Sequence, residues 1–287
     1  MVTHILGLRL HGTTLILPAG RRRAALSSLT RVQSASAGVL GAFGVVHLSA
    51  PLVGLLYGVT GDMNDRVDAA SRWMLLGRVA YQSAVGEAVV WAALGVHLAA
   101  GLAKRLITRF TVASPAAGET EVASSKAKLT WAQSSGWLLA PFALHHAIVN
   151  RVLPASGTAP ISSLSPSELD YSFVAHSLSH PNLPVRAAMG AAYTLLSAAF
   201  AVHVAYAVPA LLRSLPLRKS SSTQGTRMRK RRSKAQVAAS LAVVLLASVA
   251  SMVPLANDGL LISGTLRKRY DAVLGLAWPT RFFLHSR

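Results

Sequence analysis

Residues 131–154, WAQSSGWLLAPFALHHAIVNRVLP, are the stretch of the chain that decides the fold. Within it the only charged residue is Arg151, which lies near the end. About 20 mostly apolar residues are enough for a helix to cross the hydrocarbon core of a bilayer. Trp131 and Trp137 lie near the start, where amphipathic aromatic rings favour the headgroup layer. The stretch therefore predicts a membrane-spanning helix over residues 131–153.

The composition of the whole chain favours a protein that crosses the membrane several times. Of its 287 residues 52% are hydrophobic and only 14% are charged, and the mean hydropathy is +0.43. This is too apolar for an ordinary soluble domain. The net charge of +19 lies in short blocks between apolar stretches, which is typical of loops that flank membrane spans. These blocks favour contact with anionic lipid headgroups over nucleic-acid binding.

The hydropathy pattern predicts an all-α fold, a polytopic bundle of about five transmembrane helices. The predicted spans are residues 35–59, 79–103, 131–153, 186–212 and 235–256. They form one bundle domain, residues 35–256, which follows a basic N-terminal tail of residues 1–34. A polar loop joins the first two spans. The last segment, residues 257–287, is amphipathic enough to lie along a membrane surface.

The N-terminal tail allows two interpretations. The tail contains no acid, the first acid of the chain is Asp62, and several arginines precede it among serine, leucine and alanine. Such a segment resembles a cleaved mitochondrial presequence, but a basic cytosolic tail before a first span is the favoured interpretation. Basic residues also dominate the second-to-third and fourth-to-fifth loops. The positive-inside rule then predicts that the N-terminus lies in the cytosol, or in the matrix for an inner-membrane protein.

Two pairs of segments resemble each other and indicate an internal repeat. FGVVH, ending at His47, has the phenylalanine-to-histidine spacing of FALHH, ending at His146, and AALGVH at His97 resembles AAFAVH at His203. The first two spans would then be a diverged copy of the third and fourth, as in parallel repeats of other membrane proteins. The four histidines would occupy equivalent positions facing a common interior.

These histidines allow a sharp and a plain interpretation. In the sharp one, His47, His97, His146 and His203 include axial ligands of haem b, because bundle cofactor sites are built from side chains on facing helices. In the plain one, they form hydrogen bonds to hydroxyl or carbonyl groups of neighbouring helices. In the haem interpretation, Arg78 is one of two arginines that could contact the haem propionates.

Four further polar residues lie in the spans or at their ends: His145, Asn150, Arg151 and Glu87. Intramembrane polar groups are costly and need partners. Glu87 is expected to form an ion pair with a histidine of another helix, or with Arg78 or Arg151 near an interface. Arg151 is the second arginine that could contact a propionate.

His176 and His180 lie four residues apart in DYSFVAHSLSHP, which would place both on one face of a short interfacial helix. Both could bind zinc, but two ligands do not make a site, so no metal site is predicted. The chain has no cysteine, and Walker, GxSxG and HExxH motifs are absent from its sequence. No catalytic residue is predicted, and the protein is not expected to be an enzyme.

Three segments, SSGWLLAPFALHHAIVNRVLP (134–154), DYSFVAHSLSHP (170–181) and RKRYDAVLGLAWP (267–279), resemble the fungal mitochondrial adapter proteins of the Mcp type. The likeness extends over roughly residues 36–280. It implies a multi-span protein of the mitochondrial outer membrane with a cytosolic N-terminus. It also implies recruitment of a bridge-like, vacuolar-protein-sorting-type lipid-transfer protein to membrane contact sites, in support of lipid homeostasis.

The family's membrane domain in turn resembles the haem-bearing anchor subunits of succinate dehydrogenase. The alternative function is therefore a haem b-binding anchor or electron-transfer protein of the inner membrane, and a transporter is a third interpretation. The chain departs from the family at one point. Recruitment is attributed there to a Pro-x-Pro motif in the N-terminal region, and this sequence contains no such motif.

Overall fold

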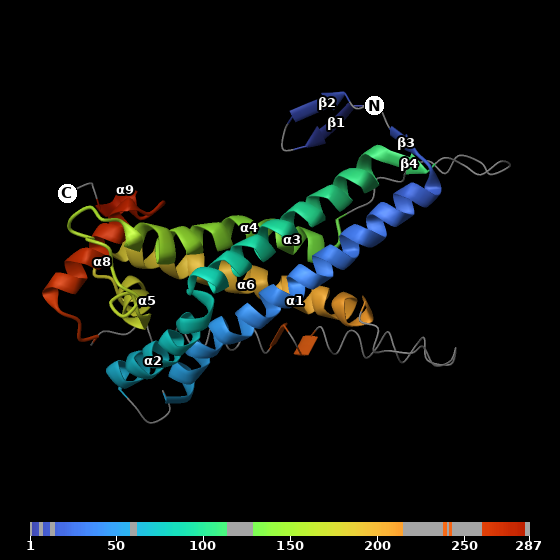
Figure 1. The fold of residues 1–287 in the computed structure, drawn as a ribbon. Helices are drawn as coiled ribbons and strands as arrows, with labels where there is room; N and C mark the ends of the chain where they lie inside the picture. The colour runs from blue at the N-terminus through green and yellow to red at the C-terminus, as the bar shows by residue number, and fades with distance from the viewer. Residues whose placement is uncertain are drawn as a thin grey trace. The chain divides into compact units, whose positions relative to one another are not determined.

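The fold is described from a computed structural model, drawn in Figure 1. The chain forms two compact units. The first consists of residues 1–43 and 84–129, and the second of residues 44–83 and 130–287. The structure describes residues 2–5, 8–11, 15–57, 62–113, 129–214, 238–239, 241–242 and 260–284. The predicted fifth span, residues 235–256, therefore lies almost entirely outside the described residues.

The described residues are mostly helical, and three helices are long and apolar enough to cross a membrane. These are α1 (Ala19–Tyr57), α3 (Ala84–Phe110) and α6 (Leu183–Ser214), with 39, 27 and 32 residues respectively. They overlap the predicted spans 35–59, 79–103 and 186–212. The chain is thus a helical protein with candidate membrane-spanning helices.

In the first unit, the N-terminal tail is more ordered than its sequence indicated. Strands β1 (Val2–Ile5) and β2 (Leu8–His11) pair antiparallel, and β3 (Leu15–Leu17) pairs in parallel with β4 (Thr111–Ala113). Helix α1 begins at Ala19, well inside the tail predicted for residues 1–34. Alanine, leucine and arginine after Pro18 are good helix formers, so the basic segment extends the apolar helix.

Helices α1 and α3 contact each other in this unit through polar side chains. Lys104 donates a hydrogen bond to Oε1 of Gln33 at 3.1 Å, and Nδ1 of His97 lies 3.3 Å from Oγ of Ser36. Gly101 allows this approach, because a Cβ there would lie 3.1 Å from Nε2 of Gln33. Small residues let helix backbones come close in this way.

In the second unit, the prediction of a polar loop between the first two spans is wrong, because these residues form helix α2 (Met63–Tyr81). The Asp62 side chain accepts hydrogen bonds from the backbone N–H groups of Asn64 and Asp65, at 2.7 and 3.0 Å. Asp65 in turn accepts from the Asp62 backbone, which completes a capping box. The helix ends at Tyr81, so the span predicted from residue 79 begins only at Ala84.

Helices α4 (Trp131–Ala147) and α6 lie side by side (Figure 1). A five-residue π-helical turn, Ile148–Val152, continues α4, and a short 3₁₀ turn, Leu153–Ala155, follows it. Helix α4 itself has 17 residues, and the π turn carries the chain through the rest of the predicted span. Trp131 stacks on Tyr206 of α6 with ring centroids 6.2 Å apart.

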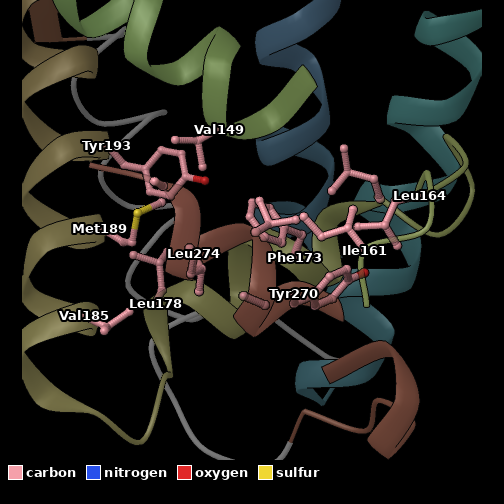
Figure 2. Packing of buried hydrophobic residues seen from close by; sticks show 14 of the residues in the cluster. Val149, Ile161, Leu164, Phe173, Leu178, Val185, Met189, Tyr193, Tyr270 and Leu274 are labelled. Atoms are coloured by element: carbon pink, nitrogen blue, oxygen red, sulfur yellow. The ribbon is translucent and has the colours of Figure 1, made fainter. Parts of the chain in front are cut away.

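The buried core of the second unit lies where α4 ends and α6 begins. Helices α5 (Tyr171–Leu178) and α8 (Gly264–Leu276) pack there, and α9 (Arg281–Leu284) follows. Figure 2 shows its large side chains converging, and the labelled members are Val149, Ile161, Leu164, Phe173, Leu178, Val185, Met189, Tyr193, Tyr270 and Leu274. Burying one side chain such as Phe173 contributes about 2 kcal/mol.

The C-terminal segment differs from the expected surface-lying tail. Tyr270, Val273 and Leu274 are fully buried, and the ring of Tyr270 packs edge-on against Phe173 at 5.1 Å between centroids. The apolar stripe of α8 is therefore covered by protein. The amphipathic pattern was correctly recognised, but the partner of its apolar face is α5 with the preceding loop.

Candidate functional site

Two of the four predicted histidines lie in direct contact in the second unit. The rings of His47 and His146 have centroids 5.8 Å apart and meet edge to face. Tyr193 of α6 packs against His146 at 5.9 Å, and Tyr81 of α2 packs against His47 at the same distance. Four helices thus contribute one aromatic ring each to a half-buried polar cluster.

Asn150, in the π turn, fixes the hydrogen-bonding pattern of this cluster. Its Oδ1 accepts a hydrogen bond from the hydroxyl of Tyr193 at 3.2 Å. Its Nδ2 donates to the carbonyl oxygen of His146 at 2.9 Å and faces Nδ1 of the same histidine at 3.3 Å. Because Nδ1 of His146 accepts, the proton of the neutral ring resides on Nε2.

In this hydrogen-bonding state His146 is not arranged as a haem ligand, and iron binding there would require its hydrogen bonds to rearrange. An iron ion needs a ring nitrogen with a free lone pair, usually with the other nitrogen donating to a neighbour. Here Nε2 carries the proton, and Nδ1 is occupied by the amide of Asn150. Ligation through Nε2 would require His146 to change its tautomer and lose that bond.

His203 lies apart from the His47–His146 pair. Its Nδ1 donates to the carbonyl oxygen of Ala132, on the first turn of α4, at 2.9 Å. Gly136 leaves room for the ring, because a Cβ there would lie 3.0 Å from Cε1 of His203. At 1.5 Å per residue, Gly136 and His146 are about 15 Å apart along α4. His146 and His203 are therefore not positioned as two ligands of one metal.

The remaining predicted polar residues have separate locations. His97 contacts Ser36 in the first unit, and Glu87 occupies the first turn of α3, where the helix dipole favours a carboxylate. His145 donates through Nε2 to the carbonyl oxygen of Trp278 at 2.5 Å, which links α4 to the segment after α8. Arg151 is exposed on the π turn.

Arg78, considered for a propionate contact, holds the loop before α5. Its Nη1 donates to the carbonyl oxygens of Pro166 and Leu169, at 2.8 and 2.5 Å. Nη1 of Arg78 thus donates to backbone carbonyls of the loop, and these hydrogen bonds compete with any bond to a haem propionate. Arginine suits this role because its fork offers several donors in one plane.

A second polar cluster contains the two histidines of the α5 segment. Nε2 of His176 lies 2.7 Å from Oδ1 of Asp271 on α8, and Nε2 of His180 lies 3.2 Å from the same oxygen. The two rings are 5.3 Å apart between centroids, and both histidines are buried. The predicted short helix and the shared orientation of its histidines are confirmed.

The hydrogen bonds in this cluster define its protonation. The backbone N–H of Asn182 donates to Nδ1 of His180 at 3.0 Å, so the His180 proton resides on Nε2 and points to Asp271. Burial by itself raises the pKa of the Asp271 carboxyl. The hydrogen bonds from His176 and His180 outweigh burial and hold that pKa well below its usual range.

A network of hydrogen bonds supports the cluster from the side of α8. The hydroxyl of Tyr270 bonds to Ser172 at 2.8 Å and donates to the carbonyl oxygen of Glu168 at 2.5 Å. Arg269 forms an ion pair with Glu168. The backbone N–H of Ser165 and the Arg269 guanidinium lower the pKa of Glu168 to about 2.

Asp271 is the residue of this cluster that sequence reasoning missed. The i, i+4 spacing reveals His176 and His180, but the carboxylate lies more than ninety residues further along the chain. Its only local signal is a single acid on an otherwise basic helix, next to a buried tyrosine. Sequence spacing cannot bring such distant residues together.

Comparison with known protein families, curated proteins and solved structures finds no match for the chain. What points to a function of this chain is therefore its own residues and the resemblance of three of its segments.

Proposed function

We propose that the protein is a multi-span adapter of the mitochondrial outer membrane, and not an enzyme. It recruits a bridge-like lipid-transfer protein to membrane contact sites and so supports lipid homeostasis. The observation that carries the proposal is that the three resembling segments contribute to one buried core. Val149, Phe173 and Tyr270, one from each segment, belong to that core (Figure 2).

The polar side chains of α4, of the π turn after it and of α6 support a structural role in which no reaction is catalysed. Asn150 joins Tyr193 to His146, and His203 binds a backbone carbonyl of α4. Polar groups used in this way hold helices together in a bilayer. They favour a rigid platform in the membrane over a catalytic or electron-transfer centre.

The proposed topology has five spans. Residues 131–153 and 235–256 join the three candidate spans α1, α3 and α6, and the basic loops then place the N-terminus in the cytosol. In this proposal the first pair of spans repeats the third and fourth. The contact between His47 and His146, the matching positions of the first and third spans, agrees with such a repeat.

The location is tested on intact fungal mitochondria that carry the full chain with an N-terminal epitope tag. Protease added from outside is expected to remove the tag while an intermembrane-space marker stays protected. A protected tag, or a protein shortened at its N-terminus as a cleaved presequence would be, contradicts the outer-membrane adapter.

The partner is tested by measuring how much bridge-like lipid-transfer protein sediments with mitochondria in cells with and without the chain. Enrichment is expected only with the chain present. A second comparison uses the chain without residues 1–34, because the family's recruitment signal lies in that region and this sequence lacks Pro-x-Pro. Equal amounts of lipid-transfer protein with and without the full chain contradict the proposal.

The second candidate function is the haem b-bearing anchor, since two of the predicted ligands, His47 and His146, lie together. It requires His146 to give up its hydrogen bond from Asn150. The test is an absorption spectrum of the detergent-purified protein, oxidised and then reduced with dithionite, after expression with ample haem. Sharp reduced bands that vanish in His47→Ala and His146→Ala support the haem anchor. A folded protein without these bands supports the hydrogen-bonding role of the histidines.

A further inference from the structure

The cluster of His176, His180 and Asp271 has the composition and convergence of a metal site. The three ligand atoms, one from each side chain, all lie within 4.8 Å of one another. Both histidines come from the α5 segment, four residues apart, and the carboxylate comes from α8. His176 lies on α5, and His180 follows two residues after the end of that helix, with both Nε2 atoms directed at the same carboxylate oxygen.

The donor set suits zinc. Imidazole nitrogen and carboxylate oxygen bind Zn²⁺ at about 2.0–2.2 Å, and two such ligands of a tetrahedral ion are about 3.3 Å apart. The Nε2 atoms now lie 2.7 and 3.2 Å from Oδ1 of Asp271. For a zinc ion to fit between these atoms, the Asp271 carboxylate has to move away from the histidines by roughly half an ångström. The Asp271 side chain is partly exposed on α8, so it has room to move.

The two histidine ligands are much more buried than the carboxylate ligand, which suits a metal site that is held by the fold and reached from one side. The side chains of His176 and His180 are 6% and 4% exposed, while that of Asp271 is 40% exposed. The two histidine side chains are thus held in place by the fold. The carboxylate side faces outward, which leaves an entry path and room for water.

We propose that His176, His180 and Asp271 bind one zinc ion, with water as the fourth ligand, and that the ion ties α8 to α5. Each histidine then binds through Nε2 and carries its proton on Nδ1. For His180 this means that the backbone N–H of Asn182 loses its present acceptor. The hydrogen-bonded arrangement and the zinc-bound arrangement are two alternative states of one cluster.

The zinc proposal does not depend on the adapter function, because it concerns how the second unit holds its C-terminal helix. Its test uses the full chain, purified in detergent with an affinity tag that contains no histidine. Zinc is measured by elemental analysis after equilibration with a small excess of Zn²⁺ and gel filtration. Co²⁺ serves as a spectroscopic probe, since its visible bands report tetrahedral coordination.

The native chain is expected to retain about one zinc per molecule and to give a saturable Co²⁺ spectrum. Asp271→Asn keeps the size of the side chain, and it is expected to weaken Co²⁺ binding at least tenfold. His180→Ala should do the same, and the matched control His145→Gln, outside the cluster, should bind like the native chain. Chelation should lower the unfolding temperature of the native chain and leave that of Asp271→Asn unchanged.

Two results would overturn the proposal. One is a folded native chain that shows no saturable Co²⁺ spectrum and retains no zinc. The other is Asp271→Asn binding Co²⁺ as tightly as the native chain, which would place the ion on other histidines. Asp271→Asn stays informative even where His180→Ala does not fold, because it keeps an acceptor for both histidine N–H groups.

Discussion

Asn150 illustrates how single polar residues hold the helices of this protein together. The side chain uses its oxygen for Tyr193 and its nitrogen for His146, so both ends of one amide are occupied. Inside a bundle such bonds matter because a polar group left without a partner in an apolar environment is costly. The location of Asn150 in a π turn aims it at α6.

We expect Asn150→Ala to destabilise the protein by about 1–3 kcal/mol, because the Tyr193 hydroxyl is left without its acceptor. Tyr193→Phe removes the hydroxyl itself, which bonds to Asn150 and Ser177, and should cost about 0.5–1.5 kcal/mol. The measurement is unfolding by SDS in mixed micelles, followed by tryptophan fluorescence. The double variant should lose less stability than the sum of the losses in the two single variants. Strictly additive losses would contradict the hydrogen bond between Asn150 and Tyr193.

The contact of Gly136 with His203 gives a second prediction at this scale. Gly136→Ala places a Cβ 3.0 Å from Cε1 of the ring, and the ring can yield only by straining its bond to Ala132. Overpacking of this kind costs about 1–3 kcal/mol. Gly41→Ala is the control, since nothing lies within 4 Å of its Cβ. The same SDS unfolding assay applies, and equal stability of the two variants would contradict the contact.

At the scale of elements, α2 shows that capping can define a helix where hydropathy indicates a loop. The signal was present in Asp62 followed three residues later by Asp65, which is a capping-box spacing. Buried Val67, Ala70 and Met74 then follow at helical intervals and pack on the core. Counting charges alone hides such a helix, because Asp65, Arg66, Asp68 and Arg72 lie in its first half.

We expect Asp62→Ala to destabilise α2 by about 1 kcal/mol, since two backbone N–H groups lose their acceptor. Hydrogen exchange in the first turn of α2 should become faster. Asp68→Ala is the matched control, because its ion pair with Arg72 is exposed and such pairs contribute about 0–1 kcal/mol. Faster exchange in Asp68→Ala than in Asp62→Ala would contradict the cap.

Glu168 gives a pH-dependent prediction for the contact between the loop and α8. Its pKa in the folded protein is lowered to about 2, below the ordinary glutamate value of about 4.3. The stabilisation is therefore present above the ordinary pKa and is lost as the pH falls toward 2. The difference in stability between the native chain and Glu168→Gln should shrink over this range. A difference that is constant with pH would contradict the bonds from Ser165 and Arg269.

At the scale of the whole molecule, the long helices leave many apolar side chains uncovered. Val45, Val79, Val85 and Leu195 are among the exposed large hydrophobic residues. A soluble protein rarely exposes such extensive apolar surface, whereas lipid covers it in a membrane. Among the described residues, the cluster of large buried side chains lies around α5 and α8, where the chain folds back on the end of α4 and the start of α6.

The chain has no cysteine, so single cysteines can report which residues lipid covers. We expect Val45→Cys and Leu195→Cys, on α1 and α6, to resist a membrane-impermeant maleimide in vesicles opened to both sides, and to react once SDS is added. Leu261→Cys, 83% exposed and outside the candidate spans, should react without SDS. Equal labelling of all three would contradict the membrane-spanning assignment of α1 and α6.

Much of the fold was predictable because long apolar runs specify membrane helices by local sequence alone. Helices α1, α3 and α6 were expected near their actual positions, and the helix around His176 was recognised from its spacing. Their ends were less predictable. Helix α1 extends into the basic tail and α2 replaces a loop, because capping and helix propensity act beside hydropathy.

The candidate site was predictable only in its parts. Adjacent histidines in an apolar run marked the α4 cluster, but its orientation depends on Asn150 and Tyr193 from two different elements. The contact between His47 and His146 agrees with the common interior expected for the four histidines, whereas the distance of His203 from that pair does not. Histidine spacing along a helix does not tell which turn of a neighbouring helix it meets.

The sequence by itself determined that this is a helical protein with apolar helices long enough to span a bilayer, because about 20 apolar residues suffice for that inference. Only the tertiary structure decided what each polar group contacts. It paired Asp271 with His176 and His180, and it placed α8 in the core instead of on a surface. The physical reason is that these contacts join residues far apart in the chain, and the apolar face of a helix does not specify what covers it.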